Sequence, residues 1–213
     1  KKIGFQKKLL HLSYGMVELP DGRMKSREGN VVDADNIINE VKDLAVKELM
    51  NRYKNIKLDE VDDRALKIAL STIKYTLLKT SIFKNVTFDP KESVSFDGDT
   101  GPYLLYSYAR AKSIIEKQSK NPENNNEINE HEYNLIKKIY GFPEVVGQGA
   151  RDLNPSIIAH FAYGLCQQFN EFYQLCPVIN SNNEKLRIEI VTAFAMVLKK
   201  SMYLMGIETI ERM

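Results

Sequence analysis

The chain has 213 residues, of which 43% are hydrophobic, and its 30 Lys and Arg against 28 Asp and Glu leave a formal net charge of +2. This length can bury a sizeable core in one large or two small domains, and it contains no apolar run long enough to span a membrane. The nearly balanced charge excludes a protein that is basic over its whole surface, so any contact with nucleic acid must come from local basic patches.

The two cysteines and the first residues bear on the compartment. Cys166 and Cys176 lie in apolar surroundings without CxxC spacing or paired histidines nearby, so we expect both to pack as small hydrophobic side chains. Free thiols are typical of a reducing compartment, and the first residues show no signal-peptide pattern. We therefore expect a cytoplasmic protein. The chain starts at Lys1 inside what reads as a structured segment, which indicates a fragment of something longer.

A turn and a basic loop occupy residues 14–30. The stretch Pro20-Asp21-Gly22 predicts a turn after the extended residues 16–19. The loop that follows ends at Gly29, and its basic and hydroxyl side chains are Arg23, Lys25, Ser26 and Arg27. Such a loop can close over a polyphosphate, where its cations neutralise the charge that develops as pyrophosphate leaves. The alternative is a surface hairpin with solvated charges.

Helical periodicity covers most of the chain after this loop. The first predicted helix begins at Asp33 or Asp35, and the second begins near Asp62. Residues 86–88 and 94–96 are too short and interrupted to be more than extended connections.

Four further helices are predicted in the second half of the chain. Their expected positions are the residues after Pro102, residues 130–140, residues from Asn154 or Ser156 to just before Pro177, and residues 184–205, which stop at Gly206. Residues 121–126 are a polar loop between two of them. The pattern breaks at residues 90–98, where we expect a domain boundary. The predicted fold class is mainly α, without an internal repeat.

The most informative stretch is residues 96–110. Asp99, Thr100 or Gly101 can cap a helix, and Pro102 suits its first position. One helical stripe is apolar and predicts a core face: Leu104, Tyr108, Ala111 and Ile115. The neighbouring stripe faces outward: Tyr103, Tyr106, Arg110, Ser113 and Lys117. Tyrosines beside cations can stack unpaired bases and hold their phosphates; alternatively, these tyrosines are half-buried core edges with their hydroxyls in water.

In this order and spacing, three segments resemble the class I aminoacyl-tRNA synthetases, and among them the arginyl-tRNA synthetases. Residues 23–27 resemble the family's divergent version of the lysine-serine signature loop, which helps to bind ATP. Residues 96–103 resemble the start of its anticodon-binding helical domain, and residues 204–213 are similar to its carboxyl terminus. The resemblance covers essentially the whole chain.

This resemblance implies a domain organisation and a set of ligands. Residues 1–30 would end the catalytic domain, residues 31–95 would form a helical connector against the inner side of the tRNA, and residues 96–213 would form an α-helical anticodon-binding bundle. The implied reaction is the ATP-dependent arginylation of tRNA(Arg) through arginyl-adenylate, with L-arginine as the other substrate. Magnesium usually accompanies ATP in such chemistry, and no carboxylate here argues for a dedicated metal site.

The resemblance also implies roles for individual residues. The implied catalytic residues are Lys25, Ser26 and Arg27, of which Lys25 and Arg27 would face phosphate. The implied ATP-binding residues are Arg23, Met24 and Lys25. Anticodon binding falls to Tyr103, Tyr106, Arg110, Tyr173 and Met213. For Arg110, a phosphate contact and an intrahelical role one turn after Tyr106 are both open.

The chain also departs from the family pattern. The loop does not spell the standard signature, and no histidine-glycine-histidine ATP signature is visible because His11, His131 and His160 stand alone. We therefore expect the back half of an enzyme, which binds tRNA but does not activate arginine by itself. The alternatives are a non-catalytic helical RNA-binding protein and a protein-interaction scaffold.

Overall fold

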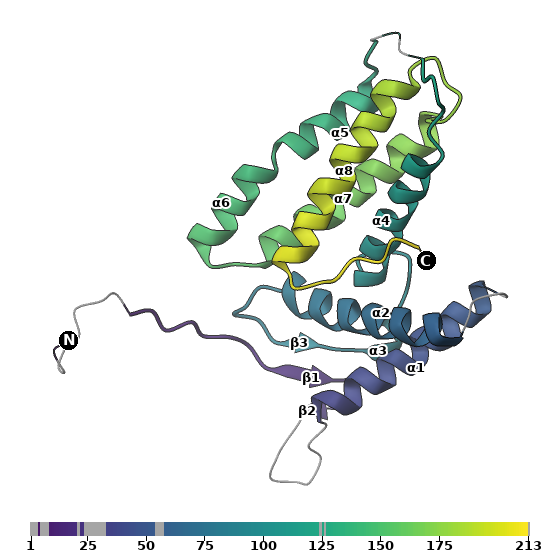
Figure 1. Cartoon of the computed structure of the whole chain (residues 1–213). Helices are drawn as coiled ribbons and strands as arrows, with labels where there is room; N and C mark the ends of the chain where they lie inside the picture. The colour runs from purple at the N-terminus through teal and green to yellow at the C-terminus, as the bar shows by residue number, and fades with distance from the viewer. Residues whose placement is uncertain are drawn as a thin grey trace.

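The computed structural model describes residues 4, 9–20, 22–23, 33–53, 58–123, 125 and 127–212, with the backbone alone at residues 22–23 and 58–59. Figure 1 shows two parts. Helices α1 (Ala34–Arg52), α2 (Leu58–Lys79) and the short α3 (Pro90–Ser93) lie together with a small sheet, and the remaining helices form a bundle that stands on α2. The mainly α fold class is confirmed.

Helices α1 and α2 pack along each other through small and branched apolar side chains. The Asp33 side chain caps α1 by accepting a hydrogen bond from the Asp35 amide, which confirms the predicted start of this helix. Helix α2 begins at Leu58, earlier than the predicted start near Asp62. Val61 in this extra turn is only 3% exposed. Tertiary packing therefore stabilises a helical turn that the local sequence pattern did not predict.

A three-stranded sheet joins the N-terminal segment to the chain after α2. The strands are β1 (Val17–Leu19), β2 (Gly22–Arg23) and β3 (Val86–Thr87), in the order β2-β1-β3. The pair β1 and β2 is antiparallel, which confirms the predicted turn between them. The pair β1 and β3 is parallel, so the expectation that residues 86–88 are only a connection is wrong. A two-residue strand has no periodicity of its own, and its partner is distant in sequence.

The bundle contains α4 (Gly101–Glu116), α5 (Glu130–Tyr140), α6 (Phe142–Asp152), α7 (Ser156–Leu175) and α8 (Glu184–Leu204) (Figure 1). Four of these helices confirm the prediction for this half of the chain. Helix α5 begins in a capping box, in which the Asn129 side chain accepts from the Glu132 amide and the Glu132 carboxylate accepts from the Asn129 amide. The rings of Phe169 and Phe194 stack between α7 and α8 with their centroids 3.9 Å apart.

Helix α6 is the one bundle helix that the sequence pattern did not predict. Its residues include Gly147 and Gly149, and glycine lowers helix propensity. Gly149 is buried, and a Cβ there would lie 3.4 Å from the Cδ1 of Ile158 on α7, so close packing supports this helix. Its C-cap is Leu153, which has a φ of 51°.

The bundle and α2 approach each other at the start of α4. A Cβ on Gly101 would lie 2.3 Å from the carbonyl oxygen of Ser71, so only glycine fits there. The Tyr75 hydroxyl on α2 donates to the Asp99 carboxylate, and Lys79 Nζ donates to the Asp99 carbonyl oxygen at 2.6 Å. One continuous apolar cluster runs through both parts. In the part of the chain that the structure describes, no helix is long and apolar enough to cross a membrane.

Candidate nucleic-acid interface

The start of α4 sets the direction of the aromatic stripe. Thr100 is the N-cap, which decides among the three predicted capping residues. Its hydroxyl accepts a hydrogen bond from the Tyr103 amide at 3.3 Å and donates to the Ser95 carbonyl oxygen at 2.5 Å. The cap therefore ties the first turn of α4 to the segment before it and fixes which side chains face outward.

The two predicted stripes of α4 differ in burial as expected. On the core stripe, Leu104 is 0% exposed and Tyr108 is 3% exposed. On the outward stripe, Tyr103, Tyr106 and Arg110 are half-buried. The remaining members of this stripe, Ser113 and Lys117, are exposed. The tyrosines thus keep one side against the core and one side accessible, which a surface that stacks bases requires.

Four polar side chains form one network between α4 and α7. Arg110 Nη2 donates to the Tyr106 hydroxyl at 2.6 Å, and Nη1 donates to Asn170 Oδ1 at 2.8 Å. Asn170 Nδ2 donates to the Tyr103 hydroxyl at 2.7 Å. The Arg110 guanidinium also lies 4.6 Å from the Tyr106 ring centroid and 5.2 Å from that of Tyr173. The structure therefore brings together the residues that the resemblance assigned to anticodon binding, except Met213.

The network also contains Asn170, which was not predicted from the sequence. Asn170 lies on α7, whose pattern is otherwise strongly apolar, and it stands three residues before Tyr173 on the same helix. A polar amide one turn from an accessible tyrosine was the available signal. Nothing in the sequence indicated that it meets Tyr103 and Arg110 across the helix interface.

Tyr103 is held as a neutral phenol. Burial raises its pKa, and the hydrogen bond from the Asn170 amide lowers it by a smaller amount. Its ring lies 5.6 Å from the ring of Tyr163 on α7, in a tilted contact. A neutral ring with a fixed hydroxyl can stack against a base without repelling the neighbouring phosphate.

A hollow of about 350 Å³ opens beside this network. Its lining includes Arg110, Ser113, Lys117, Tyr173, Pro177 and Ile179. Tyr173 is 40% exposed here, so its ring can be reached from solvent. An aromatic face together with the cations Arg110 and Lys117 matches a nucleotide, because the base can stack while the phosphate is neutralised.

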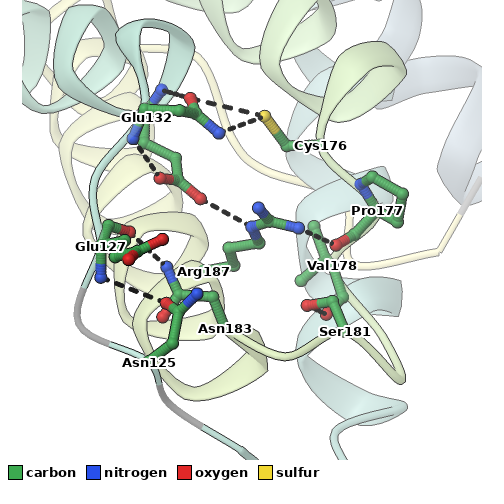
Figure 2. Close-up of polar contacts among 10 residues, drawn as sticks. Asn125, Glu127, Glu132, Cys176, Pro177, Val178, Ser181, Asn183 and Arg187 are labelled. Atoms are coloured by element: carbon green, nitrogen blue, oxygen red, sulfur yellow. Dashed lines mark hydrogen bonds and ion pairs between the residues drawn. The ribbon is translucent and has the colours of Figure 1, made fainter.

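Polar contacts hold Cys176 and Pro177 in place, and Pro177 lines this hollow (Figure 2). Arg187 on α8 donates through Nη1 to the Pro177 carbonyl oxygen at 2.6 Å and through Nε to Glu132 Oε1 at 2.6 Å. The Glu132 side chain is 1% exposed, so this ion pair is buried. Cys176 Sγ accepts a hydrogen bond from Asn129 Nδ2 at 3.4 Å. The start of α5 and α8 therefore fix the segment that follows Tyr173.

The prediction that both cysteines pack as small hydrophobic side chains is confirmed. Cys166 is 0% exposed and Cys176 is 2% exposed, and neither forms a disulfide. Burial raises the pKa of the Cys166 thiol to about 12, so it stays protonated and is not a nucleophile.

The predicted ATP-proximal loop is outside the described residues at Met24, Lys25, Ser26 and Arg27. Arg23 is described only as backbone, in β2. Met213 also lies outside the described residues. Among the residues that are described, no group of three or more His, Cys, Asp or Glu could hold a metal ion.

Comparison with known proteins decides the family. Residues 104–213 match the family model of the DALR anticodon binding domain. The chain belongs to this family. Residues 1–90 of this DALR-family chain match a second model, the catalytic domain of class I tRNA synthetases (R). The resemblance to arginyl-tRNA synthetases that the sequence indicated is thereby confirmed.

Individual relatives agree with the family. The arginine–tRNA ligase of Borrelia duttonii is 42% identical over 214 residues and that of Bacteroides thetaiotaomicron 40% over 226 residues, covering 96% and 100% of this chain. The arginyl-tRNA synthetase structure from Thermus thermophilus matches 95% of the chain with a TM-score of 0.88 at 26% identity. This DALR-family chain spans 36% and 38% of the two ligases and 35% of the Thermus chain.

Proposed function

We propose that this chain is the part of an arginine–tRNA ligase that binds tRNA(Arg) through its anticodon loop and contributes the ATP-proximal loop. The observation that carries the proposal is the network of Tyr103, Tyr106, Arg110 and Asn170 on the surface of a DALR anticodon binding domain. Because the chain covers little more than a third of its relatives, arginylation from ATP, L-arginine and tRNA(Arg) is proposed for the whole ligase.

We assign different roles to three segments of the chain. Residues 1–30 complete the catalytic domain, residues 31–95 form the helical connector that contacts tRNA, and residues 96–213 hold the anticodon loop. The two family models, which match residues 1–90 and 104–213, support a change of role within residues 90–104.

In the basic loop, we assign the phosphate-facing roles to Lys25 and Arg27, with Ser26 between them. Arg23 and Met24 contribute to ATP binding beside them. Cations in these places would stabilise the negative charge on the departing pyrophosphate. Magnesium bound to ATP would act on the same phosphates.

At the other end of the chain, bases of the anticodon loop leave their stack and lie on tyrosine rings. Tyr103 and Tyr106 present their accessible faces on α4, and Tyr173 presents its face on α7. Arg110 lies between Tyr106 and Tyr173, where it can neutralise a phosphate of the loop. Met213 is assigned to the same surface on the resemblance alone. A cytoplasmic location is proposed as well, in agreement with the two unpaired cysteines.

The test is binding of the chain to an arginine tRNA transcript and to a transcript whose central anticodon cytosine is replaced. All arginine codons share a central guanine, so that cytosine is common to every arginine tRNA. We expect the replacement, Tyr103→Ala and Tyr173→Ala each to weaken binding, since stacking on an aromatic ring contributes about 1–3 kcal/mol per base. Tyr140→Ala, at a side chain that is 85% exposed and outside the network, is the control.

A salt series and an activity assay distinguish the other functions. Equal binding of both transcripts would reduce the role to RNA binding by shape or charge. Binding to a partner protein that is independent of salt would instead favour a scaffold, because phosphate contacts are strongly salt-dependent. In an ATP–pyrophosphate exchange assay, we expect no arginine activation by the chain alone, because its sequence contains no histidine-glycine-histidine signature.

A further inference from the structure

A second hollow is also lined by Arg110. It has a volume of about 460 Å³, and its lining includes Tyr53, Tyr106, Arg110, Ser113, Glu116 and Arg212. Arg110 and Ser113 line this hollow and also the hollow beside Tyr173, so the two are neighbours along α4. Neither Tyr53 nor Arg212 was predicted from the sequence to contact RNA.

Three distant parts of the chain meet in this second hollow. Tyr53 is the C-cap of α1, Tyr106 belongs to α4, and Arg212 belongs to the segment after α8. The hollow is therefore built jointly by the connector helices and by the bundle. This joint construction distinguishes it from the hollow beside Tyr173, which only bundle residues line.

The side chains of the second hollow match a nucleotide. Tyr53 is half-buried, and burial raises its pKa, with the nearby Tyr106 phenol adding to the rise, so Tyr53 remains a neutral aromatic ring. Arg110 and Arg212 supply two positive charges. Arg212 Nη2 lies 3.6 Å from Glu116 Oε2, but both side chains are exposed, so this pair is weak and leaves Arg212 available to a phosphate.

We propose that this hollow binds a second unpaired base of the RNA, with Tyr53 and Tyr106 contacting the base and Arg212 its phosphate. The inference rests on the proposed function, since it extends the same RNA surface from the bundle to the connector. A nucleic acid fits better than a peptide, because the hollow combines aromatic rings with arginines and shares Arg110 and Ser113 with the hollow beside Tyr173, which has the same character.

The test uses the anticodon stem-loop of an arginine tRNA and the whole chain. Tyr53→Leu keeps apolar volume but removes the ring, and we expect it to weaken binding about fivefold or more. Tyr53→Phe keeps the ring and is expected to bind like the unsubstituted chain. Arg212→Gln changes a side chain that is 76% exposed, so it tests the hollow without a cost to folding. It is expected to lower the salt dependence of binding by about one phosphate contact.

Removal of single bases from the loop completes the test. A stem-loop that lacks the base bound by Tyr53 is expected to bind equally well to Tyr53→Leu and to the unsubstituted chain. A stem-loop that lacks a different base is expected to bind equally well to Tyr173→Leu and to the unsubstituted chain. If Tyr173→Leu weakens binding while Tyr53→Leu and Arg212→Gln do not, the second base site is wrong and the proposed function stands. If the unsubstituted chain does not bind the stem-loop, both are wrong.

Discussion

Asn170 on α7 accepts a hydrogen bond from Arg110 on α4 at 2.8 Å, across the helix interface and between residues that are 60 positions apart in the chain. The same amide donates to the Tyr103 hydroxyl at 2.7 Å. One side chain thus orients both an aromatic and a cationic member of the candidate RNA surface. Without it, the Arg110 guanidinium would keep only Tyr106 as a hydrogen-bond partner within the described residues.

The first prediction follows from this relationship. Asn170→Ala removes two hydrogen bonds and is expected to lower the free energy of unfolding by about 1–3 kcal/mol. Because Arg110 and Tyr103 lose their orientation, affinity for an arginine tRNA is expected to fall about tenfold, equivalent to about 1.4 kcal/mol. Urea unfolding and tRNA titration measure the two effects separately. Gln168→Ala, on the same helix but outside the network, is the matched control.

The second prediction concerns stability in acid. The Glu184 carboxylate accepts hydrogen bonds from the Ser119 amide at 2.7 Å, from the Ser119 hydroxyl at 2.8 Å and from the Asn180 amide at 2.8 Å. These hydrogen bonds hold the pKa of the Glu184 carboxyl below its ordinary value of 4.5, and the bond from the Ser119 backbone amide has the largest effect. A carboxyl whose pKa is lowered by folding stabilises the fold above its unfolded pKa, and this contribution is lost as the pH falls through the folded value.

We therefore expect the urea midpoint to decrease as the pH is lowered below about 4.5. Glu184→Gln should show a smaller decrease, because its amide does not titrate. Glu189→Gln, at an exposed position of the same helix, should follow the unsubstituted chain. Parallel pH profiles for Glu184→Gln and the unsubstituted chain would contradict this assignment.

The third prediction concerns the ion pair behind the first hollow. Arg187→Ala would leave Glu132, which is 1% exposed, without its charge partner, at an expected cost of about 3–5 kcal/mol. The double variant Glu132→Leu with Arg187→Met removes both charges and is expected to recover much of this loss. Chemical unfolding of Glu132→Leu, of Arg187→Met and of the double variant gives the coupling energy. Additive losses would show that the pair does not act as a unit.

Local signals in the sequence predicted much of the helical fold. Asp33 before an apolar periodicity marked the start of α1, and the bounds predicted for α5 agree with Glu130–Tyr140. Caps and amphipathic spacing act within one or two turns, so they can be read without the rest of the chain. The pairing of Val17 with Val86 could not be predicted in this way, because strands of two or three residues are too short to show an alternating pattern of their own.

The candidate site shows the same limit. Tyr103, Tyr106 and Arg110 could be grouped from the sequence because they share one helix face at spacings of three, four and seven residues. Asn170 reaches the group from α7, and Tyr53 approaches it from the end of α1. Only the packing of these helices brings Asn170 and Tyr53 to the group. The periodicity therefore predicted the surface of one helix, the resemblance added Tyr173 from α7, and neither indicated Asn170 or Tyr53.

The last prediction concerns the contact between the bundle and helix α2. Gly101 lies so close to α2 that a Cβ would be 2.3 Å from the Ser71 carbonyl oxygen and 2.9 Å from the Thr72 amide nitrogen. Both are backbone atoms, so Gly101→Ala forces the two helices apart. Such overpacking typically costs about 1–3 kcal/mol. We expect a lower melting temperature and weaker tRNA binding, because the second hollow is built from both sides of this contact.

Gly147→Ala is the matched control for this change. A Cβ at Gly147 in α6 would lie 3.2 Å from Arg151 Nη1, the end of a flexible side chain that can move aside. Alanine favours helix over glycine by about 1 kcal/mol, so this variant is expected to be at least as stable as the unsubstituted chain. Equal melting temperatures for both alanine variants would show that α4 and α2 adjust without strain, and that the spacing at Gly101 does not determine how the bundle stands on α2.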